Sequence, residues 1–206
     1  MLLIIGNKNY SSWSLRPWIA MKVYGMPFDE KRIPLYASGS KAEILRYSSA
    51  GKVPVLHDEG TVVWDSLAIL EYLAEREPRL WPRPAAERAK ARAIAAEMHA
   101  GFAKLREHMS MNVRKRYPGK GRTPAVLAEI ARISAIWGDA KGPFLFGEFS
   151  AADAMYAPVV LRFRTYAVEG PNRRYMDAML ALPAMREWIE AAEREPESIP
   201  ELDLYE

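Results

Sequence analysis

The sequence Asn9-Tyr10-Ser11-Ser12-Trp13-Ser14-Leu15-Arg16-Pro17-Trp18 decides the interpretation of this chain. An apolar run at 2–5 precedes it and an amphipathic segment follows it, which predicts a strand, a hydroxyl-rich turn and a helix. Three serines fall where a helix presents unbonded backbone N–H groups and the positive end of its dipole. Such a place can hold an anion, and a thiolate is one such anion.

Length and composition indicate a globular protein with one large domain or two small ones. The chain has 206 residues, 50% of them hydrophobic, and a formal net charge of +3. Its lysines and arginines are spread out rather than confined to one helix face, which does not favour a nucleic-acid partner. No apolar run approaches the length of a membrane span, and the one at the N-terminus is too short for a signal peptide. We expect a soluble cytoplasmic protein without a nucleic-acid or membrane partner.

The sequence contains no cysteine. A disulfide framework, a thiolate metal site and a cysteine nucleophile are therefore excluded. The histidines, His57, His99 and His108, do not have the spacing of a metal site, and we expect no metal. Any thiol chemistry must use a thiol that a ligand supplies.

Strand and helix signals alternate in the first part of the chain. The pattern predicts strands at 2–5, 28–35, 53–56 and 61–64, and helices at 14–24, 41–46 and 67–76. The last two strands flank Asp58-Glu59-Gly60, a turn signal, and so form a hairpin.

A proline-rich connection from Glu77 to Pro84 marks a change in composition. After it the pattern predicts helices only, at 85–113, at 124–138, after Ser150, and near 172–181 and 183–195. We therefore predict two parts, an α/β domain at 1–77 and an all-α domain at 86–206, joined by a linker at 78–85.

Pro54 stands at the start of a predicted strand, a position that a proline can occupy. Two interpretations are open. The Val53–Pro54 bond is an ordinary trans bond, or it is cis and turns the N–H and C=O of Val53 outward to pair with the backbone of a bound peptide.

Asp65-Ser66 precedes the helix predicted at 67–76. The pair can act as a helix cap alone. Alternatively, the Ser66 hydroxyl and the free N–H groups of the helix hold a ligand carboxylate, while Asp65 faces a ligand amine.

The serines of the opening stretch could activate a thiol, which is a weak nucleophile until it loses its proton. A hydroxyl hydrogen bond and a helix N-terminus both favour the charged form and so lower the thiol pKa. Ser11 is the first choice for that hydrogen bond, with Ser12 and Ser14 close behind, and the phenol of Tyr10 is a further donor. Each serine also fits a simple N-cap in a turn.

Together these segments resemble the glutathione S-transferase superfamily, over essentially the whole chain. Ser11 to Arg16 is similar to the Ser-Ser-Cys-x-x-Arg signature of the zeta class and its bacterial relatives. Lys52-Val53-Pro54-Val55-Leu56 resembles the cis-proline segment, and Asp65-Ser66-Leu67-Ala68-Ile69 resembles the glutathione-binding segment. Phe146 to Asp153 resembles the family's N-capping box, in which Ser150 and Asp153 cap a helix.

The resemblance implies a thioredoxin-like α/β domain followed by an all-α helical-bundle domain. It also implies a homodimer whose co-substrate is glutathione and whose second substrate is a small electrophile. Ser11, Ser12 or Ser14 would bond the sulfur, and Arg16 would add positive potential there or form a structural salt bridge.

The resemblance also assigns the remaining binding residues. Val53 and Pro54 would contact the cysteinyl backbone of glutathione, Asp65 and Ser66 its γ-glutamyl end, and Lys52 its glycyl carboxylate. The electrophile would lie between the domains, against a set of residues from the helical part: Phe102, His108, Met109, Asn112 and Tyr117.

One residue departs from the zeta-class signature, because Trp13 stands in place of its cysteine. That cysteine assists the isomerisation of maleylacetoacetate in the class. Its loss weakens an isomerase interpretation, as does Pro17, which a helix tolerates in its first turn. We therefore expect a glutathione transferase. The alternatives are a glutathione-dependent isomerase and a non-catalytic protein that binds a ligand or a partner.

Overall fold

The computed structural model describes residues 1–169 and 172–205. Its first part contains β1 (Leu2–Ile5), α1 (Ser12–Val23), β2 (Asp29–Arg32), α2 (Ser40–Leu45), β3 (Val55–Asp58), β4 (Thr61–Val63) and α3 (Ser66–Ala74). The strands form one sheet in the order β2-β1-β3-β4, in which β1 is parallel to β2 and antiparallel to β3. This mixed sheet with its helices confirms the predicted thioredoxin-like fold.

Local sequence explains these strands. Leu3, Ile4 and Ile5 of β1 are fully buried, as an apolar strand in the middle of a covered sheet requires. The β3–β4 hairpin turns at Glu59 and Gly60, which both have positive φ angles, of 47° and 86°. A two-residue turn of this kind matches the twist of the two strands.

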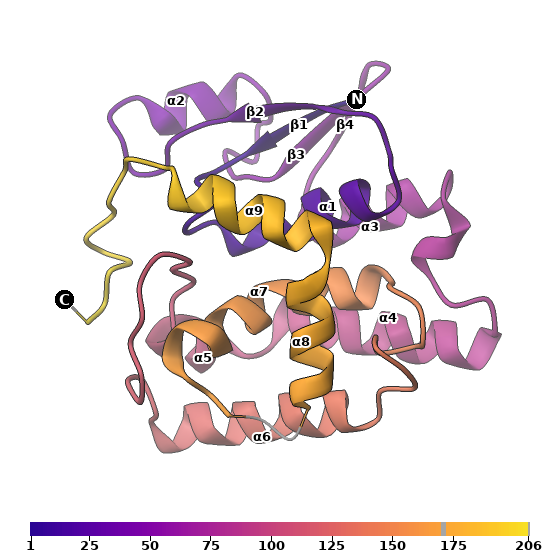
Figure 1. Cartoon of the computed structure of the whole chain (residues 1–206). Coiled ribbons are helices and arrows are strands. Elements are labelled where there is room, and N and C mark those ends of the chain that lie inside the picture. The colour runs from indigo at the N-terminus through magenta and orange to yellow at the C-terminus, as the bar shows by residue number, and fades with distance from the viewer. Residues whose placement is uncertain (170–171, 206) are drawn as a thin grey trace.

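Helices make up the second part, as predicted. They are η1 (Pro78–Leu80), α4 (Ala85–Ala100), α5 (Ala103–His108), α6 (Pro124–Gly138), α7 (Ala151–Tyr166), α8 (Arg173–Ala181) and α9 (Pro183–Glu193). In Figure 1 the sheet forms the upper part of the molecule, and α4 to α8 fill the lower part. Helix α1 lies between them and packs against α3, α7 and α9. The exact division at residues 78–85 stays a prediction.

The single helix predicted at 85–113 is wrong, because the chain breaks at Gly101 and Phe102. Phe102 has a φ angle of 57°, and a Cβ added at Gly101 would lie 2.8 Å from the carbonyl oxygen of Glu97. The apolar residues that suggested one long helix are all buried, but Met109 lies beyond the end of α5. Apolar spacing alone could not distinguish a continuous helix from two helices that share one core.

The capping box at the start of α7 is confirmed. Asp153 accepts hydrogen bonds from the backbone N–H and the hydroxyl of Ser150, both at 2.8 Å, and from the N–H of Leu145 at 3.0 Å. These bonds fix the entry to a helix that is buried along nearly its whole length and packs against both α1 and α4. Helix α7 thereby joins the two parts of the molecule.

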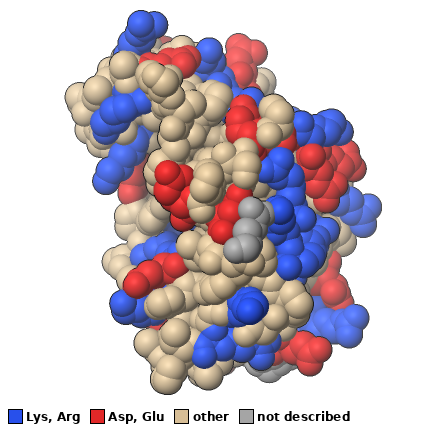
Figure 2. All heavy atoms as spheres, turned by 90° about the vertical axis from the view of Figure 1, so that its left-hand side faces the viewer, with Lys and Arg blue, Asp and Glu red and all other residues tan. Residues whose placement is uncertain are grey.

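The surface carries charges of both signs. Figure 2 shows lysine and arginine interspersed with aspartate and glutamate on the face that bears the C-terminal tail. Among the helices of the described residues, none is long and apolar enough to cross a membrane.

Candidate functional site

A cavity of about 910 Å³ lies where the loops of the sheet part meet the helical part. It brings together seven of the predicted site residues: Ser11, Ser12, Lys52, Val53, Pro54, Asp65 and Ser66. The opposite wall comes from the helical part and the C-terminal tail, with His99, Arg106, Ser110, Met111, Arg162 and Leu202. Residues that are distant in the sequence thus enclose one hollow.

Ser11 is the N-cap of α1, and its oxygen accepts a hydrogen bond from the N–H of Ser14 at 3.4 Å. Its hydroxyl donates to the Ser14 oxygen at 2.8 Å, and that oxygen also accepts from the N–H of Gly6 at 3.1 Å. Ser14 is fully buried and does not line the cavity. Since α1 begins at Ser12, Pro17 lies in its second turn rather than its first.

Ser12 meets a charged group from the helical part. Arg162 of α7 donates to the Ser12 hydroxyl oxygen from Nη2 at 3.2 Å, and its Nη1 donates to the carbonyl oxygen of Met109. Both Ser12 and Arg162 are buried, yet both reach the cavity. The first turn of α1 therefore faces a fixed cation.

Three guanidinium groups gather at this end of the cavity. Burial, with the positive charges of Arg106 and Arg162, lowers the pKa of Arg16 to about 9. Burial also lowers the pKa of Arg162 to about 10 and lowers the pKa of the half-buried Arg106. Within the described part of the chain, none of the three forms an ion pair with a carboxylate. An anion bound here would be stabilised by all three charges.

Arg16 itself lies behind the cavity wall. Its Nη1 donates to the Ser66 hydroxyl at 3.3 Å, and its guanidinium carbon lies 4.2 Å from the centre of a Trp13 ring. On the cavity side, Trp13 has Arg106 at 5.6 Å and the edge-on ring of His99 at 5.3 Å. Arg16 thus links α1 to α3 through its hydrogen bond to Ser66, without a salt bridge, and its cation–π contact with Trp13 lies within α1.

The residues just before β3 and at the start of α3 line the sheet side of the cavity. The Val53–Pro54 peptide bond is cis. Asp65 is the N-cap of α3 and accepts from the N–H groups of Leu67 and Ala68 at 3.1 and 3.3 Å. Its other oxygen lies 2.9 Å from Nε2 of His99. Asp65 therefore caps its helix and contacts the helical part at the same time.

None of the five residues predicted for the electrophile pocket lines the cavity: Phe102, His108, Met109, Asn112 and Tyr117. Met109 is fully buried, and the side chain of Asn112 donates to Asp203 at 2.6 Å. The break between α4 and α5 turns these side chains away, so that Arg106, Ser110 and Met111 occupy the wall instead.

Sequence reasoning missed Arg106, Arg162 and Leu202. For Arg162 a signal existed, because it is the one charged residue in the otherwise apolar run from Ala154 to Phe163. A charge within a buried helix is rare unless a partner holds it. The position of Leu202 had no such signal, since the C-terminal tail has no periodic pattern.

Curated and solved proteins share this fold and parts of this sequence. Maleylacetoacetate isomerase from Rattus norvegicus is 29% identical over 206 residues, which cover 93% of each chain. A probable maleylacetoacetate isomerase from Caenorhabditis elegans is 35% identical over 97 residues, which cover 46% of this chain and 45% of that protein. The crystal structure of a glutathione transferase homolog from Burkholderia gl BGR1 with bound glutathione superposes with a TM-score of 0.72. It covers 94% of this chain and 98% of that one at 20% identity, which shows a shared fold.

Family models account for most of the chain. Residues 10–76 match the model described as glutathione S-transferase, N-terminal domain, and residues 85–191 match the one described as glutathione S-transferase, C-terminal domain. The resemblance drawn from the sequence motifs is confirmed, and the chain belongs to the glutathione S-transferase family.

Proposed function

We propose that this chain binds glutathione and lowers the pKa of its thiol for attack on small electrophiles. One observation carries the proposal. The serine turn at the N-terminus of α1 lines a cavity, and the guanidinium groups near it form no ion pair with a carboxylate within the described residues. That environment favours the charged form of a bound thiol.

The residues that line the cavity can bind glutathione in one defined orientation. The backbone at Val53 and Pro54 would pair with the cysteinyl unit, in the manner of an added strand. Asp65 and Ser66, at the N-terminus of α3, would hold the γ-glutamyl end. Lys52 is exposed at the rim, where it can meet the glycyl carboxylate. The sulfur would then lie toward α1.

The chemistry follows from these positions. The bound thiol releases its proton to solvent water, and the sulfur anion accepts a serine hydrogen bond beside the positive end of α1. The anion then attacks an electrophilic carbon, a C–S bond forms, and the leaving group departs. Holding both reactants in one cavity contributes several kcal/mol, on the order of 7–11 for well-oriented reactants.

A glutathione-dependent isomerase is a second candidate, favoured by one residue of the cavity. Arg106 reaches the lining from the helical side and could pair with a carboxylate on the electrophile. The two relatives named maleylacetoacetate isomerase support this candidate. In that reaction glutathione adds, a carbon–carbon bond rotates, and glutathione leaves unchanged. Trp13 in place of the signature cysteine weighs against it.

Binding and turnover together test these functions. Calorimetry should show saturable binding of glutathione, and a generic aryl halide should be conjugated in its presence. Binding with isomerisation of a maleyl substrate, but without conjugation, would favour the second candidate. Failure to bind glutathione would contradict both and leave a partner-binding role.

Family membership also supports a homodimer in the cytoplasm, which we include in the proposal. Sedimentation equilibrium of the purified chain should give twice the mass of 23.3 kDa. A monomer at all concentrations would contradict this part of the proposal and leave the chemistry untouched.

A further inference from the structure

Ser11 and Ser12 both line the cavity, but their hydroxyl protons are donated differently. A serine hydroxyl has one proton to donate and can accept through its oxygen. The Ser11 hydroxyl donates to the Ser14 oxygen at 2.8 Å, and its own oxygen accepts from the N–H of Ser14. The Ser11 proton is therefore occupied within the turn.

Ser14 cannot pass that hydrogen bond on to a ligand. It is fully buried, it lies outside the cavity lining, and its oxygen already accepts from the N–H of Gly6. Ser11 and Ser14 thus form a closed pair that caps α1 and ties it to the end of β1.

Ser12 has the opposite arrangement. Its oxygen accepts from Arg162 at 3.2 Å, and within residues 1–169 and 172–205 its hydroxyl donates to no protein group. Because the guanidinium has no lone pair to accept, it can only be the donor. The Ser12 proton is consequently left for the cavity, where the sulfur of a bound thiol would lie.

Arg162 is held in place from two sides. Its Nη1 donates to the carbonyl oxygen of Met109, its Nη2 donates to Ser12, and it projects from the buried helix α7. Only 4% of its surface is exposed. A cation with neutral partners only, in a buried site, polarises the hydroxyl to which it donates.

We propose that Ser12, rather than Ser11, donates the hydrogen bond to the thiolate, and that Arg162 is the positioning residue that turns its proton toward the sulfur. The inference rests on the proposed function, because it names the donor within that site. The phenol of Tyr10 is excluded as the donor by its own contacts: it donates to Asp203 and accepts from the N–H of Ile199.

The test is the pKa of the glutathione thiol in the binary complex, measured by ultraviolet absorbance of the thiolate across a pH titration. Ser12→Ala should raise this pKa by at least about one unit, a tenfold loss of thiolate at a pH well below it. Ser11→Ala, the competing candidate in the same turn, should raise it by clearly less, because the Ser11 proton is already held by Ser14. Ser12→Thr keeps a hydroxyl and should restore most of the effect.

The positioning role of Arg162 is tested by combining its substitution with that of Ser12. Arg162→Met should raise the thiol pKa, and the double variant Ser12→Ala/Arg162→Met should raise it no further than Ser12→Ala alone, because Arg162 acts through that hydroxyl. If Arg162→Met does not fold, Arg162→Gln keeps a donor without the charge and should raise the pKa by a smaller amount. Additive effects of the two sites would overturn the positioning role of Arg162.

A second ligand separates the failure of this inference from the failure of the proposed function. S-methylglutathione has no thiol proton, and every variant should bind it with a Kd within about twofold of the parent protein, since the peptide contacts are unchanged. A rise in thiol pKa for Ser11→Ala but not for Ser12→Ala would overturn the inference and leave the function standing. No binding of glutathione by the parent protein would overturn both.

Discussion

The phenol of Tyr10 donates a hydrogen bond to the carboxylate of Asp203, 3.0 Å away, across 193 positions of sequence. Asp203 also accepts from the side chain of Asn112 at 2.6 Å. The C-terminal tail is thus fastened to the turn that precedes α1 and to the loop that follows α5. Leu202, its neighbour, lines the cavity. The tail therefore forms part of the wall of the site.

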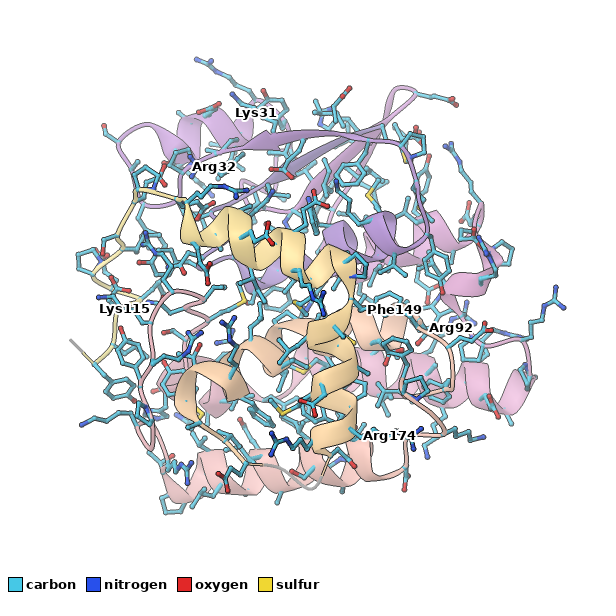
Figure 3. All side chains as sticks on the ribbon, viewed as in Figure 1. Lys31, Arg32, Arg92, Lys115, Phe149 and Arg174 are labelled. Carbon is cyan, nitrogen blue, oxygen red and sulfur yellow. The ribbon has the colours of Figure 1, made fainter. Side chains whose placement is uncertain are left out.

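A second set of contacts fastens the start of the tail. The Glu195 carboxylate accepts from the N–H groups of Lys8 and Asn9 at 2.7 and 3.0 Å. Arg32 of β2 lies at the C-terminal end of α9 in Figure 3, 3.7 Å from Glu195 and 2.9 Å from Glu197. Burial raises the pKa of Glu195, and the two N–H donors oppose that rise. These contacts hold the backbone just before the serine turn.

Loss of Asp203 should weaken both the fold and the site. Asp203→Ala leaves the buried donors of Tyr10 and Asn112 without their acceptor, which costs about 1–3 kcal/mol in the free energy of unfolding. Because Leu202 should shift with it, KM for the electrophile should rise more than Kd for glutathione. Urea unfolding and steady-state kinetics measure the two effects. Glu201→Ala, exposed on the same tail, should change neither, and equal behaviour of the two variants would contradict the role of the tail.

Tyr10→Phe should separate stability from thiol activation. The substitution removes the hydrogen bond to Asp203, so the free energy of unfolding should fall by about 1 kcal/mol. The pKa of the bound thiol should stay unchanged, because the phenol is already engaged. Thiolate absorbance and urea unfolding of one preparation give both values. A raised thiol pKa would show that Tyr10 reaches the sulfur.

Arg106→Gln should discriminate between electrophiles. Arg106 lines the cavity and can pair with a carboxylate, and a charged hydrogen bond is worth about 1.5–3 kcal/mol. KM for a carboxylate-bearing electrophile should therefore rise about tenfold or more, which corresponds to ~1.4 kcal/mol, while KM for a neutral aryl halide changes little. Lys104→Gln, exposed on the same helix, is the control. An equal rise for both electrophiles would refute the assignment.

Stability should depend on pH through Asp153. Its complete burial raises its pKa from 3.8 to about 6. The folded state therefore holds the Asp153 proton more tightly than the unfolded state does. The stability that the protonated carboxyl contributes is fully present below pH 3.8 and is lost as the pH rises through about 6. Relative to Asp153→Asn, which cannot titrate, the free energy of unfolding should fall with rising pH by up to about 3 kcal/mol. Urea unfolding at several pH values measures the difference. A flat or rising difference would contradict the prediction.

Much of the fold follows from local sequence. Leu2 to Ile5 specifies a buried strand, Glu59-Gly60 specifies a hairpin turn, and Ser150 with Asp153 specifies a helix start, because each signal acts within a few residues. The break at Gly101 and Phe102 escaped the same reasoning, since apolar side chains keep their spacing through it.

The sequence predicted the residues on the sheet side of the cavity but not those on its helical side. Ser11, Ser12, Val53 and Asp65 lie in motifs whose turn and cap chemistry is local, and the structure brings them to one cavity. The other wall depends on contacts over long sequence distances, such as the 150 positions between Ser12 and Arg162. No local pattern encodes such a contact. Only the isolated charge of Arg162 in an apolar helix could have indicated it.

The most direct test of the account is the thiol pKa of glutathione bound to the unmodified protein, compared with that of free glutathione in the same buffer. With a helix N-terminus, a serine hydroxyl and nearby guanidinium groups all favouring the anion, the bound value should be lower by at least about one unit. A bound thiol that titrates at the same pH as the free one would contradict the central claim.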